Sequence, residues 1–377
     1  MNELNVLFID PQQLRYDYGL LENLNCNVTF CCRDKYDDPG IESIVLKKYF
    51  RYHLYDSIIL KSLSYAISLI RTLLYIIIHR PDVIHIQWWR IWYLDYLFLF
   101  CARPFTKSII FTAHNLLPHD TGISMKTKCV KYYNKVDYII VHAYSTKDEL
   151  INDFGINASK IYVIKHGLMK VKCNEEEVRG ISCQIKEKYK IDSKIVFTLL
   201  GNQNQYKGFD LVEEVWTTTP ELKNNEDVIL FVAGKSRTVN TKRLELSSNV
   251  VIIDRILTDE EFMAITDVSS IVLLPYTKIS QSGLLLTALE QEKPVLVSNV
   301  GGLTEPLDYA DIGWNIGLPS VSNLRSKMLE IIRNPQQIDA INENVTGWGK
   351  IKSIYSWSEI AKQTMMLYWK SIQNLKN

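Results

Sequence analysis

The chain has 377 residues, about twice the size of an ordinary domain, and this length predicts two domains. Hydrophobic residues make up 47% and charged residues 23%, which excludes the disordered and low-complexity classes. With 43 basic against 42 acidic side chains, the net charge of +1 excludes a generally cationic nucleic-acid binder. The N-terminal MNELNVLFIDPQQ lacks the basic start and long apolar core of an export signal, so we expect a cytoplasmic protein with reduced cysteines. The scattered spacing of its seven cysteines predicts no metal site.

Short apolar runs alternate with longer helix-like stretches along the whole chain. The runs are continuous rather than alternating, which suits strands buried on both faces of a parallel sheet. Two such series, separated by a polar and charge-rich stretch near 168–192, predict two doubly wound α/β domains. The expected strands are 4–9, 27–32, 82–88, 108–114, 136–142 and 160–165 in the first series, and 194–201, 227–234, 249–254, 269–275 and 294–299 in the second.

The most apolar stretch, residues 58–78, is long enough to cross a membrane. Its polar residues recur every three or four positions and form one stripe on a helix, with Lys61 and Arg71 among them. Such a stripe favours a helix that packs on the first sheet or lies partly in a membrane interface, and a true span is the alternative. Residues 46–110 carry nine Lys and Arg against three Asp beside several Trp and Tyr. This combination suits anionic headgroups, although the aromatics could equally be core.

Two segments of the second series carry groups that could bind a phosphate. In LLGNQNQYKGF a strand ends at Gly201 and Lys207 stands at the start of a helix, where an ammonium and free amides attract anions. In SQSG (280–283) Ser282 is the expected N-cap of an apolar helix, which leaves the amides near Gly283 and Leu284 free. Taken singly, each pattern is also typical of an ordinary surface lysine or an ordinary capped helix.

The first series contributes a histidine. The strand SIIFTAH ends at His114, and His119 and Asp120 follow it. Because ligands bind at the carboxyl ends of parallel strands, we expect His114 at a binding site. No G-x-G-x-x-G follows a strand, which argues against a dinucleotide-dependent oxidoreductase, and a two-domain solute-binding protein would need an export signal.

Together these segments resemble the family-four glycosyltransferases, retaining enzymes of the GT-B fold with two facing Rossmann-like domains. The resemblance covers nearly the whole chain. It implies an acceptor-binding domain over 1–170, a nucleotide-sugar donor domain over 185–350 and a terminal helix, 355–377, that returns to the first domain. The segments that carry it are DVIH (82–85), FTAHN (111–115), LLGNQNQYKG (199–208), FVAG (231–234), DRILTDEEF (254–262) and SQSGLLLTALEQEKPVLVSNVGGLTE (280–305).

The resemblance also assigns roles to individual residues. It places Lys207 on the donor diphosphate, gives His114 a sugar-contacting role in catalysis, and puts the backbone of Arg255 and Ile256 against the nucleobase. It implies no metal and no cofactor, since Lys207 and helix amides would stabilise the leaving diphosphate. The remaining implied donor-binding residues are Gly201, Asn202, Ser280, Gln281, Ser282, Gly283, Leu284 and Thr287.

Three features depart from the family pattern. Asn202 stands where the family has an arginine that binds the diphosphate in two-pronged fashion. Ile279 and Thr287 occupy the positions of two glutamates eight residues apart, and the glycine-rich loop after the first strand is absent. The replacements that the sequence offers are Lys235 or Arg255 for the cation and Glu290 for the second glutamate.

The predicted function is therefore a retaining, metal-independent transfer of a hexose from a UDP- or GDP-linked donor to a glycan. A lipid-linked oligosaccharide is the preferred acceptor, and surface polysaccharide biosynthesis is the expected setting. The expected location is cytoplasmic, with peripheral contact to the inner face of the plasma membrane. The alternative is a catalytically weakened homologue that acts as a partner or scaffold subunit, which Asn202 and Thr287 favour.

Overall fold

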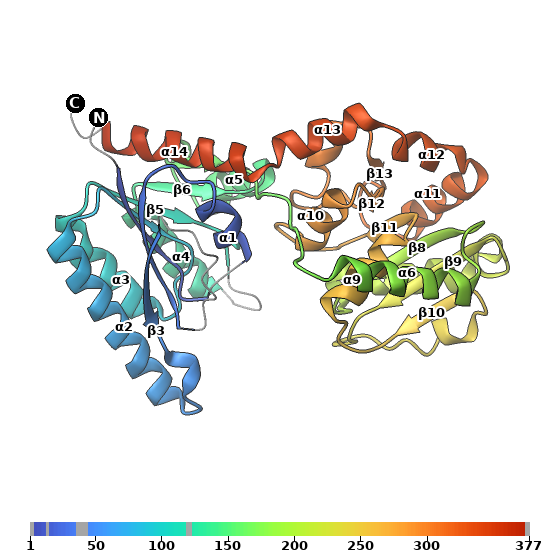
Figure 1. Ribbon diagram of the computed structural model, residues 1–377, viewed down its shortest axis with the longest axis horizontal. Helices are drawn as coiled ribbons and strands as arrows, with labels where there is room; N and C mark the ends of the chain where they lie inside the picture. The colour runs from blue at the N-terminus through green and yellow to red at the C-terminus, as the bar shows by residue number, and fades with distance from the viewer. Residues whose placement is uncertain (1–3, 13–14, 35–43, 118–122, 374–377) are drawn as a thin grey trace. The chain divides into compact units, whose positions relative to one another are not determined.

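A computed structural model describes residues 4–12, 15–34, 44–117 and 123–373. The chain divides into two compact units (Figure 1). The first unit comprises residues 1–167 and 355–377, and the second comprises residues 168–354. Each unit is built on a sheet whose strand pairs are all parallel, which confirms the doubly wound α/β class.

The sheet of the first unit has seven strands in the order β3-β2-β1-β4-β5-β6-β7. Strand order reverses between β1 and β4, so this pair marks the topological switch point, where ligands bind in open parallel sheets. The strands are β1 (Asn5–Ile9), β2 (Asn27–Arg33), β3 (Ile44–Phe50), β4 (Val83–Ile86), β5 (Ser108–Thr112), β6 (Tyr138–Val141) and β7 (Ile161–Val163).

Helices cover both faces of this sheet (Figure 1). Leu7 and Ile9 of β1 point into a core formed with α2, α3, α4 and α5, whereas Val6 and Phe8 point into a second core closed by α1 and α14. The helices are α1 (Arg15–Leu21), α2 (Ile58–His79), α3 (Trp92–Ala102), α4 (Ile123–Lys135), α5 (Tyr144–Asn152) and α14 (Trp357–Gln373).

The sheet of the second unit has six strands in the order β10-β9-β8-β11-β12-β13, with its switch point between β8 and β11. Its core packs α7, α8, α11 and α12 on one face and α6, α9 and α10 on the other. The strands are β8 (Ile195–Leu200), β9 (Val228–Ala233), β10 (Val250–Ile253), β11 (Ile271–Leu274), β12 (Val295–Val297) and β13 (Gly313–Asn315). The helices are α6 (Glu175–Tyr189), α7 (Phe209–Thr218), α8 (Pro220–Lys223), α9 (Asp259–Asp267), α10 (Gly283–Glu290), α11 (Val321–Arg333), α12 (Gln336–Asn342) and α13 (Val345–Ile354).

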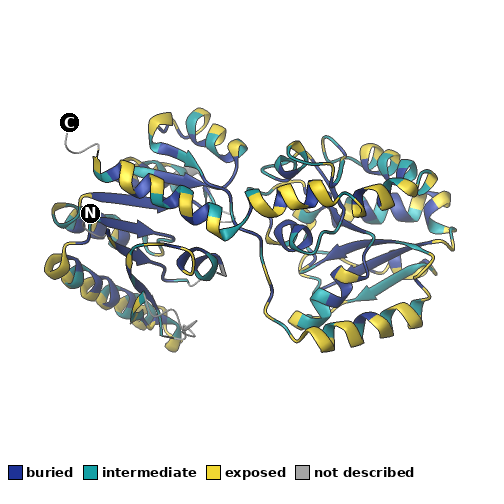
Figure 2. Cartoon of the chain, turned by 45° about the horizontal axis from the view of Figure 1, so that its top comes forward, coloured by how far each residue is buried: buried dark blue, intermediate teal, exposed yellow. Residues whose placement is uncertain are grey.

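The apolar stretch at 58–78 forms the predicted helix, α2, and two residues of its polar stripe, Ser68 and Thr72, face the core, whereas Arg71 is exposed. Ser68 and Thr72 are 2% and 0% exposed, and their hydroxyls donate to the carbonyls of Ser64 and Ser68 one turn earlier. Figure 2 shows the exposed side of α2. The residues exposed there are largely apolar. A serine or threonine can turn inward because its single hydroxyl is satisfied within the helix.

Candidate active site

The predicted anion-binding residues of the second unit lie at its switch point. Lys207 ends the short 3-10 turn Gln205–Lys207 that follows β8, and Ser282 begins α10 after β11. Strands β8 and β11 are hydrogen-bonded neighbours, so both residues follow the carboxyl ends of adjacent strands. The structure therefore brings together the two segments that the sequence marked separately.

The Lys207 ammonium has no acidic partner among the residues that the structure describes. Its Nζ lies 3.5 Å from the carbonyl oxygen of Leu200 and 5.9 Å from the ring centre of Tyr276. Burial lowers the pKa of Lys207 to about 8. A partly buried cation without a carboxylate is well placed to bind an anionic ligand, which would restore the charged form.

Helix α10 directs its amino end to the same place. The Ser282 hydroxyl accepts a hydrogen bond from the amide of Leu285 at 3.3 Å, which confirms Ser282 as the N-cap. The amides of Gly283 and Leu284 have no acceptor within the helix. The Ser282 hydroxyl also lies 3.5 Å from the hydroxyl of Tyr276, the residue whose ring faces Lys207. Tyr276 thus links the lysine to the helix end.

At two glycines of this site, the backbone packs directly against the backbone of the segment that follows β11. Gly208 has φ +78°, and a Cβ there would lie 2.1 Å from the carbonyl oxygen of Pro275. Gly301 has φ +56°, and a Cβ there would lie 2.1 Å from the carbonyl oxygen of Ile279. Glycine is required at both positions because the left-handed backbone and the close approach exclude a side chain. These contacts fix the backbone directly after Lys207 against Pro275, and the 279–280 segment against Gly301.

Arg255 and Ile256 follow β10, two strands from β8. The Arg255 guanidinium is held by a two-pronged ion pair with Glu261 of α9, which raises the pKa of Arg255, and Ile256 is exposed. Lys235 is paired with Asp254 at 3.2 Å. Both cations considered as replacements for the missing arginine therefore already have carboxylate partners.

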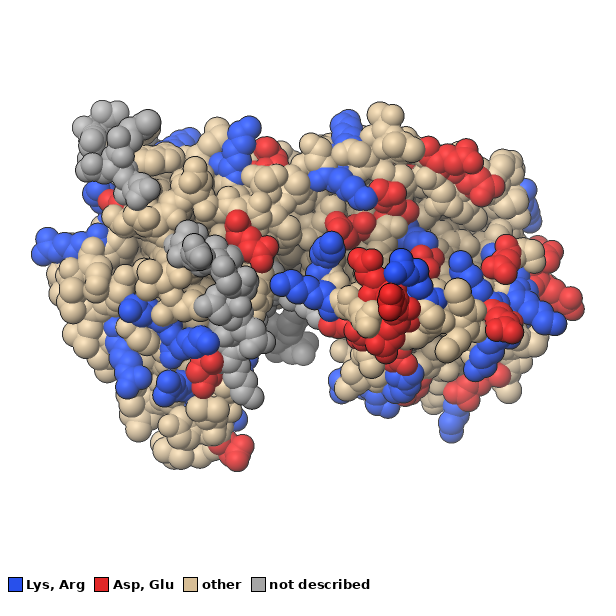
Figure 3. Space-filling model, viewed as in Figure 1, with Lys and Arg blue, Asp and Glu red and all other residues tan. Residues whose placement is uncertain are grey.

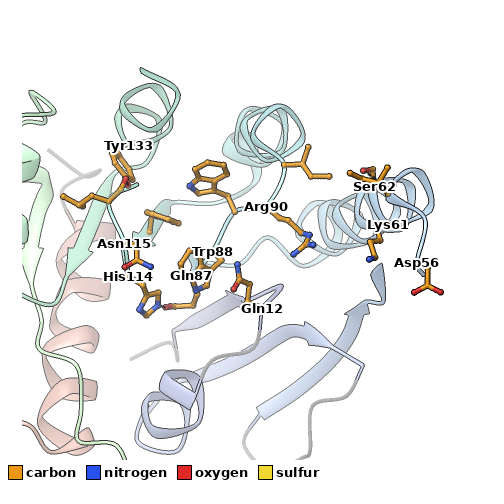
Figure 4. A pocket seen from close by; sticks show the side chains of 15 residues that line it. Gln12, Asp56, Lys61, Ser62, Gln87, Trp88, Arg90, His114, Asn115 and Tyr133 are labelled. Atoms are coloured by element: carbon orange, nitrogen blue, oxygen red, sulfur yellow. Dashed lines mark hydrogen bonds between the residues drawn. The ribbon is translucent and has the colours of Figure 1, made fainter. Parts of the chain in front are cut away.

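The first unit contains a cavity of about 730 Å³ at its own switch point (Figure 4). Gln12 follows β1, Trp88 and Arg90 follow β4, and His114 follows β5, so the walls come from the carboxyl ends of adjacent strands. Lys61 of α2 adds a cation to the wall. The predicted His119 and Asp120 lie outside the described residues.

Within this cavity the ring of His114 contacts three neighbouring side chains. Its ring stacks on that of Trp88 at 5.7 Å, its Nδ1 lies 3.2 Å from Nε2 of His142, and its Nε2 lies 2.9 Å from the side-chain amide of Gln87. Burial, reinforced by His142 nearby, lowers the pKa of His114 well below its ordinary value. His114 is therefore neutral, and both its ring nitrogens are bonded inside the protein.

The family of the chain follows from two matches that together span more than half of its length. Residues 19–168 match the description "Glycosyltransferase Family 4", and residues 183–348 match "Glycosyl transferases group 1". The chain belongs to glycosyltransferase family 4. A search of the curated proteins returns no match.

Solved structures show that this glycosyltransferase has the GT-B fold. A glycosyltransferase from Rickettsia africae matches with a TM-score of 0.70 at 15% identity, over 99% of this chain and 100% of the other. Anabaena HepE, solved in complex with UDP, matches with a TM-score of 0.70 at 13% identity, over 97% and 100% of the two chains. The sucrose-phosphate synthase of Thermosynechococcus elongatus matches with a TM-score of 0.70 at 16% identity, over 97% and 98%.

The positions at which this glycosyltransferase departs from its family differ in their surroundings. Asn202 is exposed in the loop after β8. Thr287 is 3% exposed, and its hydroxyl donates to the carbonyl of Gly283 at 3.1 Å within α10. Glu290 lies at the far end of α10, about 10 Å from Gly283 by the helix rise, and lines a separate groove with Lys170 and Arg179.

Sequence reasoning missed three residues of these sites. Gln87 comes directly after the buried strand β4 and Tyr276 two residues after β11, so their position beside a switch-point strand was a usable signal. His142 likewise follows β6. Their partners come from distant segments, and the sequence contains no pattern that pairs them.

Proposed function

We propose that this glycosyltransferase moves a hexose from a nucleotide-diphosphate sugar to a glycan, with the donor diphosphate held at the switch point of the second unit. The observation that carries the proposal is the convergence of Lys207 and the amino end of α10, joined through Tyr276. Anabaena HepE, which shares the fold, has been solved with UDP-glucose. A UDP-linked hexose is therefore the first donor to assay, with the GDP-linked hexoses next.

The chemistry requires stabilisation of a leaving anion. Breaking the sugar–phosphate bond places negative charge on the nucleoside diphosphate, and fixed donors aimed at that charge supply a large catalytic contribution. Lys207 would contribute an ammonium, and Gly283 and Leu284 would contribute amides at a helix end whose dipole favours an anion. This donor set performs the task of a divalent cation, and we infer a metal-independent reaction with retention of configuration, as in the family.

The acceptor is proposed to bind in the cavity of the first unit. Trp88 offers a flat face, and Arg90, Lys61 and Gln12 offer polar groups for sugar hydroxyls. His114 would orient the sugar as a neutral ring rather than act as the main base. We propose a lipid-linked glycan of surface polysaccharide biosynthesis as the acceptor, at the cytoplasmic face of the membrane.

Release of nucleotide from a panel of UDP- and GDP-hexoses tests the function. Lys207→Ala should lower transfer by about 10²- to 10³-fold, the range for losing one transition-state donor. Lys293→Ala is the matched control, because Lys293 is also a partly buried lysine of this unit but precedes β12 at the opposite edge of the sheet. Normal turnover by Lys207→Ala would remove Lys207 from the mechanism.

The scaffold alternative makes a different prediction in the same assay. Exposed Asn202 and the Thr287 hydroxyl, already bonded to Gly283, are the features that favour it. A scaffold homologue would bind UDP or GDP in a thermal-shift assay yet release no nucleotide from any donor. The anomeric configuration of the product, read by NMR, tests retention separately.

A further inference from the structure

Helix α2 carries its apolar side outward. Six exposed residues recur at alternating spacings of three and four, which places them on one side of the helix. Leu63, Ile70 and Leu74 are 56%, 56% and 54% exposed. Isolated exposed apolar residues are normal, but a stripe along a 22-residue helix is not. The stripe consists of Leu60, Leu63, Ile67, Ile70, Leu74 and Ile77.

Helix α3 extends this surface. It packs beside α2 on the same core, and Tyr65 of α2 donates a hydrogen bond to Asp95 of α3 at 2.6 Å. Tyr93, Leu97 and Phe100 of α3 are 70%, 57% and 67% exposed at helical spacing. The outward residues of the two helices, the stripe on α2 and these three on α3, form what we call the α2–α3 face.

The α2 helix cannot leave this position to cross a bilayer without dismantling the first unit. By length and composition it is the one helix among the described residues that could span a membrane. However, Tyr65, Leu69 and Ile76 belong to the core beneath the sheet, and Tyr65 is bonded to buried Asp95. A helix with one side in a protein core and the other side apolar can lie along a membrane surface.

The charges around the α2–α3 face suit an anionic surface. Residues 46–110 hold nine Lys and Arg against three Asp, in a chain whose net charge is only +1. Asp95 is buried, and two of the nine cations are already paired, Lys107 with Asp82 at 2.6 Å and Arg103 with Asp137 at 2.5 Å, which leaves seven. Lys and Arg gather over α2 and β3 in Figure 3. A second copy of this chain would bring two basic surfaces together, whereas anionic lipid headgroups complement them.

The α2–α3 face is continuous with the acceptor cavity. Ile58, Lys61 and Ser62 of the first turns of α2 line that cavity together with Trp88 and Arg90. We propose that the α2–α3 face lies on an anionic bilayer and holds the mouth of the cavity at the level of the headgroups. This proposal rests on the proposed function and specifies its acceptor: a glycan whose lipid anchor stays in the bilayer while its sugar enters the cavity.

Vesicle flotation of the full chain tests the surface. The wild-type protein should float with vesicles of phosphatidylglycerol and phosphatidylcholine and bind phosphatidylcholine alone much more weakly. The triple variant Leu63→Gln, Ile70→Gln, Leu74→Gln should bind the anionic vesicles at least about tenfold more weakly, because it removes apolar area that enters the interface. A control variant, Leu246→Gln, Leu318→Gln, Val345→Gln, changes three apolar side chains of the second unit that are even more exposed and should float like the wild type.

Two results would overturn the proposal. One is equal flotation of the wild type and the α2 variant. The other is a vesicle-independent dimer that the α2 variant converts to a monomer, as seen by light scattering, because a second copy would then cover the face. Nucleotide release from UDP-hexoses with a water-soluble glycan acceptor separates this test from the proposed function. The α2 variant should retain that activity and lose transfer to a lipid-anchored acceptor.

Discussion

At the scale of single residues, His114 belongs to a buried chain of hydrogen-bonding groups. Nδ1 of His142 lies 2.8 Å from the carbonyl oxygen of Ile164 and must donate to it. Burial lowers the pKa of His142 to about 3, so this ring is neutral, and its Nε2 lies 3.2 Å from Nδ1 of His114. Nε2 of His114 lies 2.9 Å from Oε1 of the Gln87 amide.

The same chain of bonds continues to α14. The amide nitrogen of Gln87 lies 3.0 Å from Nε2 of His85, and Nδ1 of His85 lies 2.6 Å from the hydroxyl of Tyr368. Burial lowers the pKa of His85 to about 3, so this ring is also neutral. Gln87 is fully buried and bonds two neutral rings at once. We therefore regard it as a positioning residue for His114.

Replacing Gln87 by an isosteric apolar side chain tests that role. Gln87→Met should lower kcat for transfer by about tenfold, because His114 loses the group that fixes its Nε2, at a stability cost of about 1–3 kcal/mol for the unsatisfied partner. Nucleotide affinity, measured by calorimetry, should not change, since the donor residues belong to the second unit. Gln363→Met, the same substitution on the surface of α14, is the control. An unchanged kcat for Gln87→Met would show that His114 needs no such support.

At the scale of elements, the last helix closes the first unit through one tryptophan. Trp357 of α14 packs where two glycines leave room: a Cβ on Gly19 would lie 2.1 Å from its ring, and a Cβ on Gly167 would lie 2.4 Å from it. Ile360, Leu367 and Tyr368 continue the contact with the core on this face of the sheet. The helix is thus an integral part of the first unit although 187 residues of the second unit, 168–354, precede it in the chain.

A pair of glycine substitutions separates packing from helix propensity. Gly19→Ala in α1 should lower the free energy of unfolding by about 1–3 kcal/mol, since overpacking outweighs the roughly 1 kcal/mol that alanine gains over glycine in a helix. Gly180→Ala in α6 has no atom within 4 Å of the new Cβ and should stabilise the second unit by about 0.5–1 kcal/mol. Urea unfolding of both variants measures the difference. A stabilised Gly19→Ala variant would show that Trp357 moves aside easily.

The sequence predicted every inner strand of the two sheets. All eleven expected strands are present: nine are inner strands, which read as continuous apolar runs, and two, β7 and β10, are edge strands. The two strands that were not predicted, β3 and β13, lie at the edges of their sheets and are largely only half-buried. The inward turn of Ser68 and Thr72 escaped prediction for a related reason. Periodicity gives the sides of a helix, but only packing decides which side faces the core.

At the scale of the whole molecule, the two units differ in their response to acid. All seven histidines of the chain lie within residues 1–167 and none lies in the second unit. Burial lowers the pKa of His85 and His142 to about 3 and that of His166 to about 4. Unfolding exposes these rings to water, where their pKa returns to about 6.5 and they take up protons in mild acid.

The direction of the pH effect on stability follows from the coupling between proton binding and folding. A group with a lowered pKa in the folded state contributes its full stability above its unfolded pKa, and this stability falls as the pH drops toward the folded value. When the pH is lowered from 7.5 to 5, each of the three rings should reduce the free energy of unfolding of the first unit by about 2 kcal/mol. Burial raises the pKa of Asp95 to about 7, so this carboxyl acts in the opposite direction and offsets part of the loss. With these four groups the free energy of unfolding of the first unit should fall by about 3 kcal/mol, and His114, whose pKa burial also lowers, adds to this loss.

Calorimetry at the two pH values tests this difference between the units. The first unit should unfold roughly 10 °C lower at pH 5 than at pH 7.5, given about 2–4 °C per kcal/mol for a unit of this size. The transition of the second unit, identified by its upward shift with added UDP, should move much less. Asp95→Asn removes the opposing group and should make the first transition more sensitive to acid. If both transitions moved together, or the second unit unfolded first, the buried histidines would not control the acid stability of the molecule.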